Sequence, residues 1–336
     1  MRKYSFSLFF LVLGMICLFV ANLSAQNKVS VDNDKSLNVG SYKSLQNYID
    51  ISSLPMNKRP KVFSDLSAED KADLFRLHLA LQIVKRPNLT QEQKNVILES
   101  LSSVTPESYD RENSEKRLKA QQEANLLEQK ARSAFPGQEV SEIFASLGGN
   151  QEDIEVLQKY LNIANLPTIA QRKKSFGQYS ATDKSNLWKI QMAYYLAKDE
   201  QLNEFQRNFI LRMINFVNPR MFDLTKGSEE KNAMERTIMN LKVEADNLFP
   251  EKKSIKIFSS LASSTEAPSM ESPSKNTPVT PNLAPGPRDC SCRQGWTSCS
   301  SGYSCTNGGQ CVATEWGCGL FWYYECNGDC LRCYGC

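Results

Sequence analysis

Histidine is almost absent from this chain, because His78 is the only one among 336 residues. This excludes a His-Glu-x-x-His zinc site and every metal centre with several histidine ligands, and a Ser-His-Asp triad would have to use His78. His78 lies in the helical apolar pattern LFRLHLALQIV, which favours a hydrogen-bonded, semi-buried side chain over a catalytic base. We therefore expect no catalytic residue, no metal and no cofactor.

A strong charge of either sign is also lacking. The formal net charge is +3, from 40 Lys and Arg against 37 Asp and Glu. Both signs are interspersed along the chain, and no basic stripe indicates nucleic-acid binding. We therefore expect no nucleic-acid partner, while the oligomeric state stays open.

Long apolar runs are confined to the N-terminus, where Leu8–Val20 follows two basic residues and ends shortly before Ala25. This order is typical of a secretory signal peptide, here residues 1–25, cleaved after Ala25. The run is shorter than the ~20 residues of a membrane span. Cys17 lies within the run and allows a lipoprotein signal as the alternative. We expect a secreted chain, either extracellular or located in the periplasm or at the cell surface.

Cysteine is missing between residues 18 and 289, and this region carries an internal repeat instead. In the first pair of stretches six of eleven positions are identical. Further matches follow at an offset of 113 residues after a one-residue insertion, and at 114 after one more insertion. The repeat predicts a tandem duplication of a unit of about 105 residues, with copies at 43–148 and 154–262. The matching stretches include LQNYIDISSLP (45–55) with LQKYLNIANLP (157–167), SAEDKADLF (67–75) with SATDKSNLW (180–188), and ARSAFPGQEVSEIFASL (131–147) with ADNLFPEKKSIKIFSSL (245–261).

Both copies carry helix-start signals, and their apolar residues recur at helical spacing without sustained apolar–polar alternation. We therefore expect an all-α fold with roughly four to six helices per unit. The charged stretch 111–132 predicts a solvated helix, with disorder as the alternative. The capping pairs are Ser67 with Asp70, Ser180 with Asp183, Thr90 with Gln93, and Asn203 with Gln206.

The C-terminal part changes composition twice. Residues 263–287 are rich in proline, serine and threonine, which predicts a disordered linker. Residues 288–336 then hold ten cysteines, and a domain this small needs covalent staples to be stable. In a compartment that permits disulfides we expect a small disulfide-rich domain of undetermined connectivity. Its cysteines are Cys290, Cys292, Cys299, Cys305, Cys311, Cys318, Cys326, Cys330, Cys333 and Cys336.

Two other uses of these cysteines compete with the bridges. Cys326, Cys330, Cys333 and Cys336 have spacings that a four-cysteine zinc site could use. A redox Cys-x-x-Cys pair is the other alternative, but it lacks the strand-to-helix context that lowers a thiol pKa. The oxidising compartment and the six cysteines upstream favour bridges.

Aromatic residues are abundant in the tail, which contains no lysine. A small disulfide domain cannot bury so many rings, so we expect an aromatic surface that contacts a bacterial envelope, a membrane surface or a sugar. The alternative is that LFWYY, residues 320–324, forms the core strand of the domain. The candidate contact residues are Trp296, Trp316, Phe321, Trp322, Tyr323 and Tyr324.

The spacing of the first six of these cysteines resembles that of the fulvocin C-related bacteriocin family, over residues 290–328. The resemblance implies a disulfide-stapled antimicrobial peptide. Glu325-Cys326 departs from the family, which has Cys-x-Cys there, and three cysteines are added downstream, so the family's bridging pattern does not transfer intact. Besides the cysteines, the matching residues are Gly317, Gly319, Trp322, Tyr324, Asn327 and Gly328.

The leading hypothesis is a secreted bacteriocin-like protein whose C-terminal peptide acts on competitor bacteria, with or without release from the chain. The alternative is a secreted or cell-surface adhesion protein whose tail is a carbohydrate- or envelope-binding module. A disulfide oxidoreductase ranks third, because nothing in the tail indicates a thiol of low pKa.

Overall fold

The computed structural model describes most of the helical region and parts of the tail. The predicted signal peptide, the linker at 263–287, Trp296 and five of the tail cysteines lie outside the described residues, as do the side chains of Trp316, Cys305, Cys311 and Cys330. The described residues are 42–109, 114–144, 147–261, 288–289, 303–307, 311–312, 314–326 and 328–332.

The fold is mostly helical, as the sequence predicts. The charged stretch at 111–132 lies largely within helix α6, Ser114–Ala134. The other helices in the first half are α2 (Lys43–Ser52), α3 (Arg59–Asp65), α4 (Ala68–Lys85), α5 (Gln91–Ser103), the 3-10 helix η3 (Pro106–Tyr109) and α7 (Gly137–Phe144). The second half contains α8 (Gln151–Ala164), α9 (Ile169–Gly177), α10 (Ala181–Lys198), α11 (Glu204–Phe216), α12 (Arg220–Asp223), α13 (Glu229–Leu248) and α14 (Glu251–Phe258).

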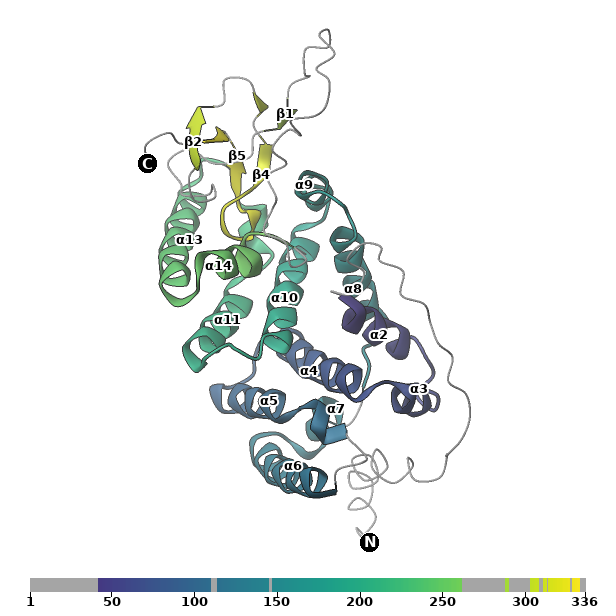
Figure 1. Ribbon diagram of the computed structural model, residues 1–336. Coiled ribbons are helices and arrows are strands. Elements are labelled where there is room, and N and C mark those ends of the chain that lie inside the picture. The colour runs from purple at the N-terminus through teal and green to yellow at the C-terminus, as the bar shows by residue number, and fades with distance from the viewer. Residues whose placement is uncertain are drawn as a thin grey trace. The chain divides into compact units, whose positions relative to one another are not determined.

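The chain divides into two compact units. The first comprises the described residues up to Gln158 together with Ala193–Leu202, and the second comprises Lys159–Met192 and the described residues from Asn203 onward. In the first unit, α4 packs against α2, α5 and α7, and α6 packs against α5 and α7 (Figure 1). Leu74 and Leu77 of α4 are fully buried, which places this helix in the core.

Side-chain caps set the starts of several helices, and the predicted capping pairs are confirmed. The Ser67 hydroxyl accepts a hydrogen bond from the backbone amide of Asp70, at 3.0 Å. Thr90 and Asn203 each form a complete capping box with the glutamine three residues later. A cap satisfies amides that the first helical turn leaves without a partner, so these residues fix where the helices begin.

Some positions that the sequence repeat aligns form similar hydrogen bonds. The Arg59 guanidinium donates through Nε to the Leu54 carbonyl at 2.9 Å, and Arg172 donates to the Leu166 carbonyl at the same distance. A second pair also joins positions that the repeat aligns: Gln93 donates to the Ala134 carbonyl at 3.0 Å, and Gln206 donates to the Leu248 carbonyl at 2.7 Å. Each bond ties a helix to a carbonyl elsewhere in its unit.

The described part of the tail consists of short strands, unlike the helical remainder. The antiparallel pairs are β2 with β6 and β4 with β5, while β1 and β3 are parallel. A short 3-10 helix, η4 (Leu320–Trp322), lies between β4 and β5. The strands are β1 (Arg288–Asp289), β2 (Tyr303–Asn307), β3 (Cys311–Val312), β4 (Thr314–Cys318), β5 (Tyr324–Cys326) and β6 (Gly328–Arg332).

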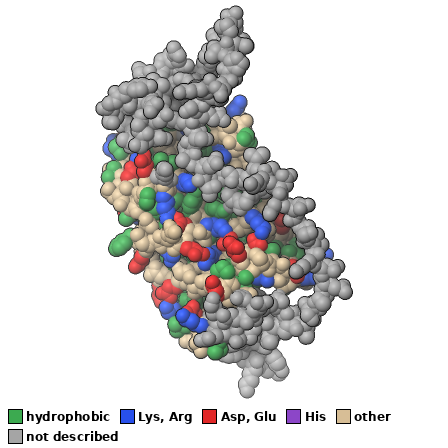
Figure 2. Space-filling model, in the orientation of Figure 1, with side chains coloured by type: hydrophobic (Ala, Val, Ile, Leu, Met, Phe, Trp, Pro, Cys, Tyr) green, Lys and Arg blue, Asp and Glu red, His purple; other side chains and the backbone are tan. Residues whose placement is uncertain are grey.

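Charged side chains of both signs are interspersed over the described part of the face shown in Figure 2. This matches the small formal net charge of the chain. None of the helices in the described ranges combines the length and apolar character that a membrane span requires.

Candidate functional site: an aromatic segment packed in the second helical unit

The tail enters the second unit through the hairpin that β4 and β5 form. Cys318 at the end of β4 and Cys326 at the end of β5 are joined by a disulfide, with Cα atoms 5.3 Å apart. A bridge over this short span stabilises the folded state by about 2–3 kcal/mol, chiefly by restricting the unfolded chain. With Cys326 in a bridge, the four-cysteine zinc alternative loses one of its ligands. Within the described residues no group of three or more His, Cys, Asp or Glu is placed to hold a metal.

The bridge encloses a turn with unusual backbone angles. Gly319 has φ 72°, and two aromatic residues follow in the same left-handed region, Phe321 at φ 58° and Trp322 at φ 51°. This region costs a residue with a side chain roughly 1–2 kcal/mol. Bulky residues adopt it only where the surrounding structure holds them there. The turn is therefore shaped by what it packs against.

Helices of the second unit bury this turn completely. Leu320, Phe321, Trp322, Tyr323 and Tyr324, here called the aromatic segment, are each no more than 2% exposed. In Figure 1 the β4–β5 hairpin reaches down to α14, which contacts η4.

Aromatic rings of the helices form the surface on which the segment packs. The Trp322 ring lies 5.4 Å from Phe176 and 5.6 Å from Trp188, both nearly perpendicular to it. Phe321 lies 5.6 Å from Trp188 and 6.4 Å from Phe258. Edge-to-face pairs of this kind contribute about 0.5–1.5 kcal/mol beyond the area they bury. Phe222 completes the surface against Tyr323, at 6.5 Å. We call Phe176, Trp188, Phe222 and Phe258 the acceptor rings.

The polar ends of two segment residues bond to helix carbonyls. Trp322 Nε1 donates to the carbonyl oxygen of Ser259 at 2.8 Å, and the Tyr324 hydroxyl donates to that of Glu235 at 2.8 Å. A buried indole or phenol needs such a partner, because an unmade hydrogen bond costs about 1–3 kcal/mol. These two bonds fix the orientation of the segment against α13 and α14.

Lysine side chains border the aromatic segment. Lys173 Nζ lies 4.0 Å from Cys326 Sγ, and burial lowers the pKa of this amine to about 8. Lys184 lies over the Phe176 ring at 5.8 Å, and Lys231 lies over the Tyr323 ring at 5.7 Å. Cations over ring faces favour the aromatic cluster further.

These positions differ from the expected exposed contact surface. Four of the candidate contact residues, Phe321 to Tyr324, are buried because the second helical unit covers them. The segment is also not the core strand that was the alternative, since Leu320–Trp322 form a 3-10 helix and only Tyr324 begins a strand. Trp316 lies in β4. Trp188, which the sequence predicts to be a core residue, is fully buried, and Phe321 and Trp322 of the tail are among the residues that contact it.

No protein-family model, curated protein or solved structure matches the chain. The resemblance to the fulvocin C-related family therefore stays a prediction that rests on the tail residues that carry it.

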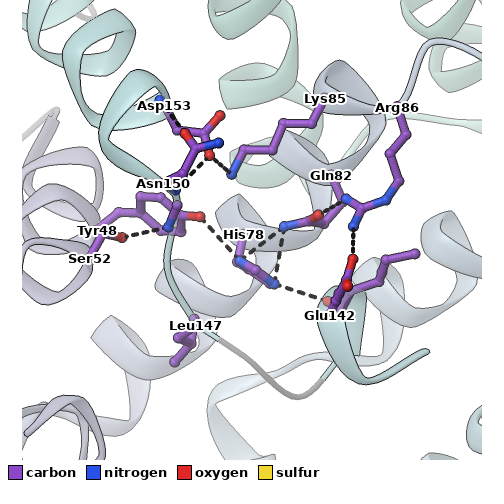
Figure 3. Close-up of polar contacts among 12 residues, drawn as sticks. Tyr48, Ser52, His78, Gln82, Lys85, Arg86, Glu142, Leu147, Asn150 and Asp153 are labelled. Carbon is purple, nitrogen blue, oxygen red and sulfur yellow. Dashed lines mark hydrogen bonds and ion pairs between the residues drawn. The ribbon is translucent and has the colours of Figure 1, made fainter. Parts of the chain in front are cut away.

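His78 lies in the first unit, apart from any described cysteine, and is fully buried. Its Nε2 donates to the Ile143 carbonyl at 2.9 Å, and its Nδ1 lies 3.2 Å from the Tyr48 hydroxyl, which donates to it (Figure 3). The carbonyl can only accept, so the neutral ring carries its proton on Nε2. As the sequence predicts, His78 is hydrogen-bonded within the core, with Gln82 beside its ring.

Burial and nearby cations keep this histidine neutral. Burial is the main cause that lowers the pKa of His78 to about 3, and the positive charges of Lys85 and Arg86 act in the same direction. Lys85 pairs with Asp153 at 2.8 Å and Arg86 with Glu142 at 3.2 Å, as the dashed lines in Figure 3 show. The neutral His78 ring therefore joins α4 to α2 through Tyr48 and to α7 through the Ile143 carbonyl.

Acidification should destabilise the first unit through His78. In the unfolded chain its pKa is near 6.5, so below that pH the unfolded state binds a proton that the folded state excludes until about pH 3. The free energy of unfolding should therefore fall by about 2 kcal/mol between pH 7 and pH 5. Urea unfolding at both pH values measures this change. In His78→Gln the free energy of unfolding should fall less between pH 7 and pH 5, because the titrating ring is gone. A fall of the same size in the variant would show that His78 is not the source of this pH dependence.

Proposed function

We propose that the chain is a secreted, fulvocin C-related bacteriocin-like protein whose helical region carries the C-terminal peptide and covers its aromatic segment. The observation that carries this proposal is the burial of residues 320–324 by helices of the second unit. Exposed apolar patches of this kind bind other proteins and membranes. A carrier that covers the patch would keep the peptide inert until it reaches its target.

We further propose that the carrier is a tandem duplication, with the tail as a separate disulfide-rich domain. The support is the match of helices across the halves: α4 and α10 span Ala68–Lys85 and Ala181–Lys198, and α5 and α11 are also of equal length. The hydrogen bonds of Arg59 and Arg172 also join positions that the repeat aligns. Duplication of the helical unit would supply the copy on which the tail packs, so that no different fold is needed to cover it.

The adhesion alternative is less favoured by the same contacts. An envelope-binding module that works in place needs its rings on the surface, whereas four of the six candidate rings lie beneath helices. Such a module would have to use Trp296 or Trp316 instead.

Growth inhibition by full-length variants tests the proposal. Trp188→Phe and Trp188→Ala change the acceptor surface without changing the peptide, whereas Trp322→Ala changes the peptide itself. Trp188→Ala weakens the contacts that hold the aromatic segment against the helices. We therefore expect this variant to raise the inhibitory activity of the secreted chain about tenfold, the factor that corresponds to the loss of one or two ring contacts. Trp188→Phe should raise it less, and Trp322→Ala should abolish inhibition.

The controls separate activity from misfolding. Circular dichroism of each variant reports retention of the helices, and intact mass of the secreted protein reports whether the tail is released. Absence of inhibition by the full chain, by its released tail and by both Trp188 variants across a panel of related bacteria would overturn the proposal.

A further inference from the structure

The backbone at 263–287, and no disulfide, connects the helical region to the tail. Residues 18–289 contain no cysteine, so no bridge within one chain can join a helix to the tail. Cys17 lies within the predicted signal peptide and is lost when that peptide is removed. If the chain is cut at 263–287, non-covalent contacts alone decide whether the tail stays on the helices.

The contacts described above for the aromatic segment come from residues that precede this stretch. The acceptor rings extend from Phe176 to Phe258 along the sequence. The two carbonyls that accept hydrogen bonds from the segment belong to Glu235 and Ser259. A cut at 263–287 therefore leaves the residues on both sides of this contact in place.

The contact has the composition of a specific protein–protein interface. Trp322 and Tyr324 are each 1% exposed, and each donates a hydrogen bond to a helix carbonyl. Desolvated tryptophan and tyrosine residues supply much of the binding energy in such interfaces. The Cys318–Cys326 bridge closes the loop that carries the segment. A segment restricted in this way loses less conformational freedom on binding, so more of the contact energy appears as affinity.

We infer that the second helical unit is a binding partner of the tail and retains it as a separate chain after a cut at 263–287. In the intact chain the connecting backbone only raises the local concentration of the tail. Release of the peptide then requires dissociation of the aromatic segment from the acceptor rings, and cleavage by itself leaves the peptide covered. The inference rests on the carrier role proposed above, but it does not depend on antimicrobial activity.

A full-length chain with a protease recognition sequence placed within 263–287 tests the inference. After the cut, size-exclusion chromatography of the protein at about 1 μM, without reductant, separates bound from free tail, and mass spectrometry identifies the fragments in each peak. We expect the two fragments to elute together in buffer, which requires a Kd below about 1 μM, and to elute apart in urea.

Variants of the cut chain test whether the aromatic segment is the contact. Tyr324→Phe keeps the ring and removes the hydroxyl that donates to the Glu235 carbonyl, so it should raise the Kd about 2- to 10-fold. Trp322→Ala removes a buried anchor and should raise the Kd about 30-fold or more. Phe205→Ala is the matched control, because Phe205 is 75% exposed, and it should leave the Kd unchanged.

Each remaining outcome also decides. Fragments that separate in buffer at 1 μM overturn the inference, and so does a Kd that neither Tyr324→Phe nor Trp322→Ala changes. Tyr324→Phe covers the case in which Trp322→Ala fails to fold. A tail that stays bound but never inhibits bacteria, even after separation in urea and return to buffer, would overturn the proposed function while the inference stands. Fragments that separate and a free tail that inhibits would give the reverse result.

Discussion

Replacing Trp322 with alanine is expected to lower the free energy of unfolding of the second unit by about 3–5 kcal/mol, the range for a fully buried large aromatic residue. Trp322 is 1% exposed and contacts Phe176 and Trp188. Its removal leaves a cavity at the centre of the cluster and also deprives the Ser259 carbonyl of its indole donor. Urea denaturation followed by far-ultraviolet circular dichroism measures the loss, since the unfolding helices dominate that signal.

A matched alanine replacement at Phe205 provides the control. Phe205 is 75% exposed on α11, so Phe205→Ala should change the free energy of unfolding by less than about 0.5 kcal/mol. If Trp322→Ala left the helical unit equally stable, the aromatic segment would not be part of its core in solution. The carrier proposal would then lose its main support.

Local signals explain why the helical region could be predicted from the sequence. Capping pairs such as Thr90 with Gln93 lie within one helical turn, so their geometry depends on few other residues. Apolar spacing likewise indicates that Leu74 and Leu77 belong to the core, but it does not indicate that α4 is covered on every side, as residues 76–83 are. The internal repeat shows several helix starts twice, because the same capping pairs recur at the aligned positions.

The place of the aromatic segment could not be predicted in this way. Its partners, among them Phe176 and Phe258, lie far from it in the sequence and on different helices. Periodicity reports which face of an element is apolar and not which element covers it. The surplus of rings in the tail correctly indicates a large apolar surface, but composition alone does not show that helices of the same chain cover residues 320–324.

The two core networks lead to the last prediction, because His78 and Gln191 occupy equivalent positions. In the first unit Tyr48 donates to His78, which donates to the Ile143 carbonyl. In the second, the Tyr160 hydroxyl donates to Gln191 Oε1. Gln191 Nε2 donates to the Lys256 carbonyl at 2.8 Å and lies 3.3 Å from the Ser260 carbonyl. A glutamine therefore links the tyrosine of one helix to a carbonyl of α14, as the neutral histidine links Tyr48 to a carbonyl of α7, although Lys256 lies one position before the residue that aligns with Ile143.

Gln191→Leu should lower the free energy of unfolding by about 2–4 kcal/mol, because the buried Tyr160 hydroxyl and the carbonyls of Lys256 and Ser260 lose the partner that Gln191 provides. His78→Gln should cost less than about 1 kcal/mol at pH 7, since the amide can repeat the Tyr160–Gln191 arrangement between Tyr48 and Ile143. Thermal and urea unfolding of the full chain measure both changes. Losses of equal size would show that the two cores are not interchangeable at this position, and the duplication would then explain their sequence match without explaining their packing.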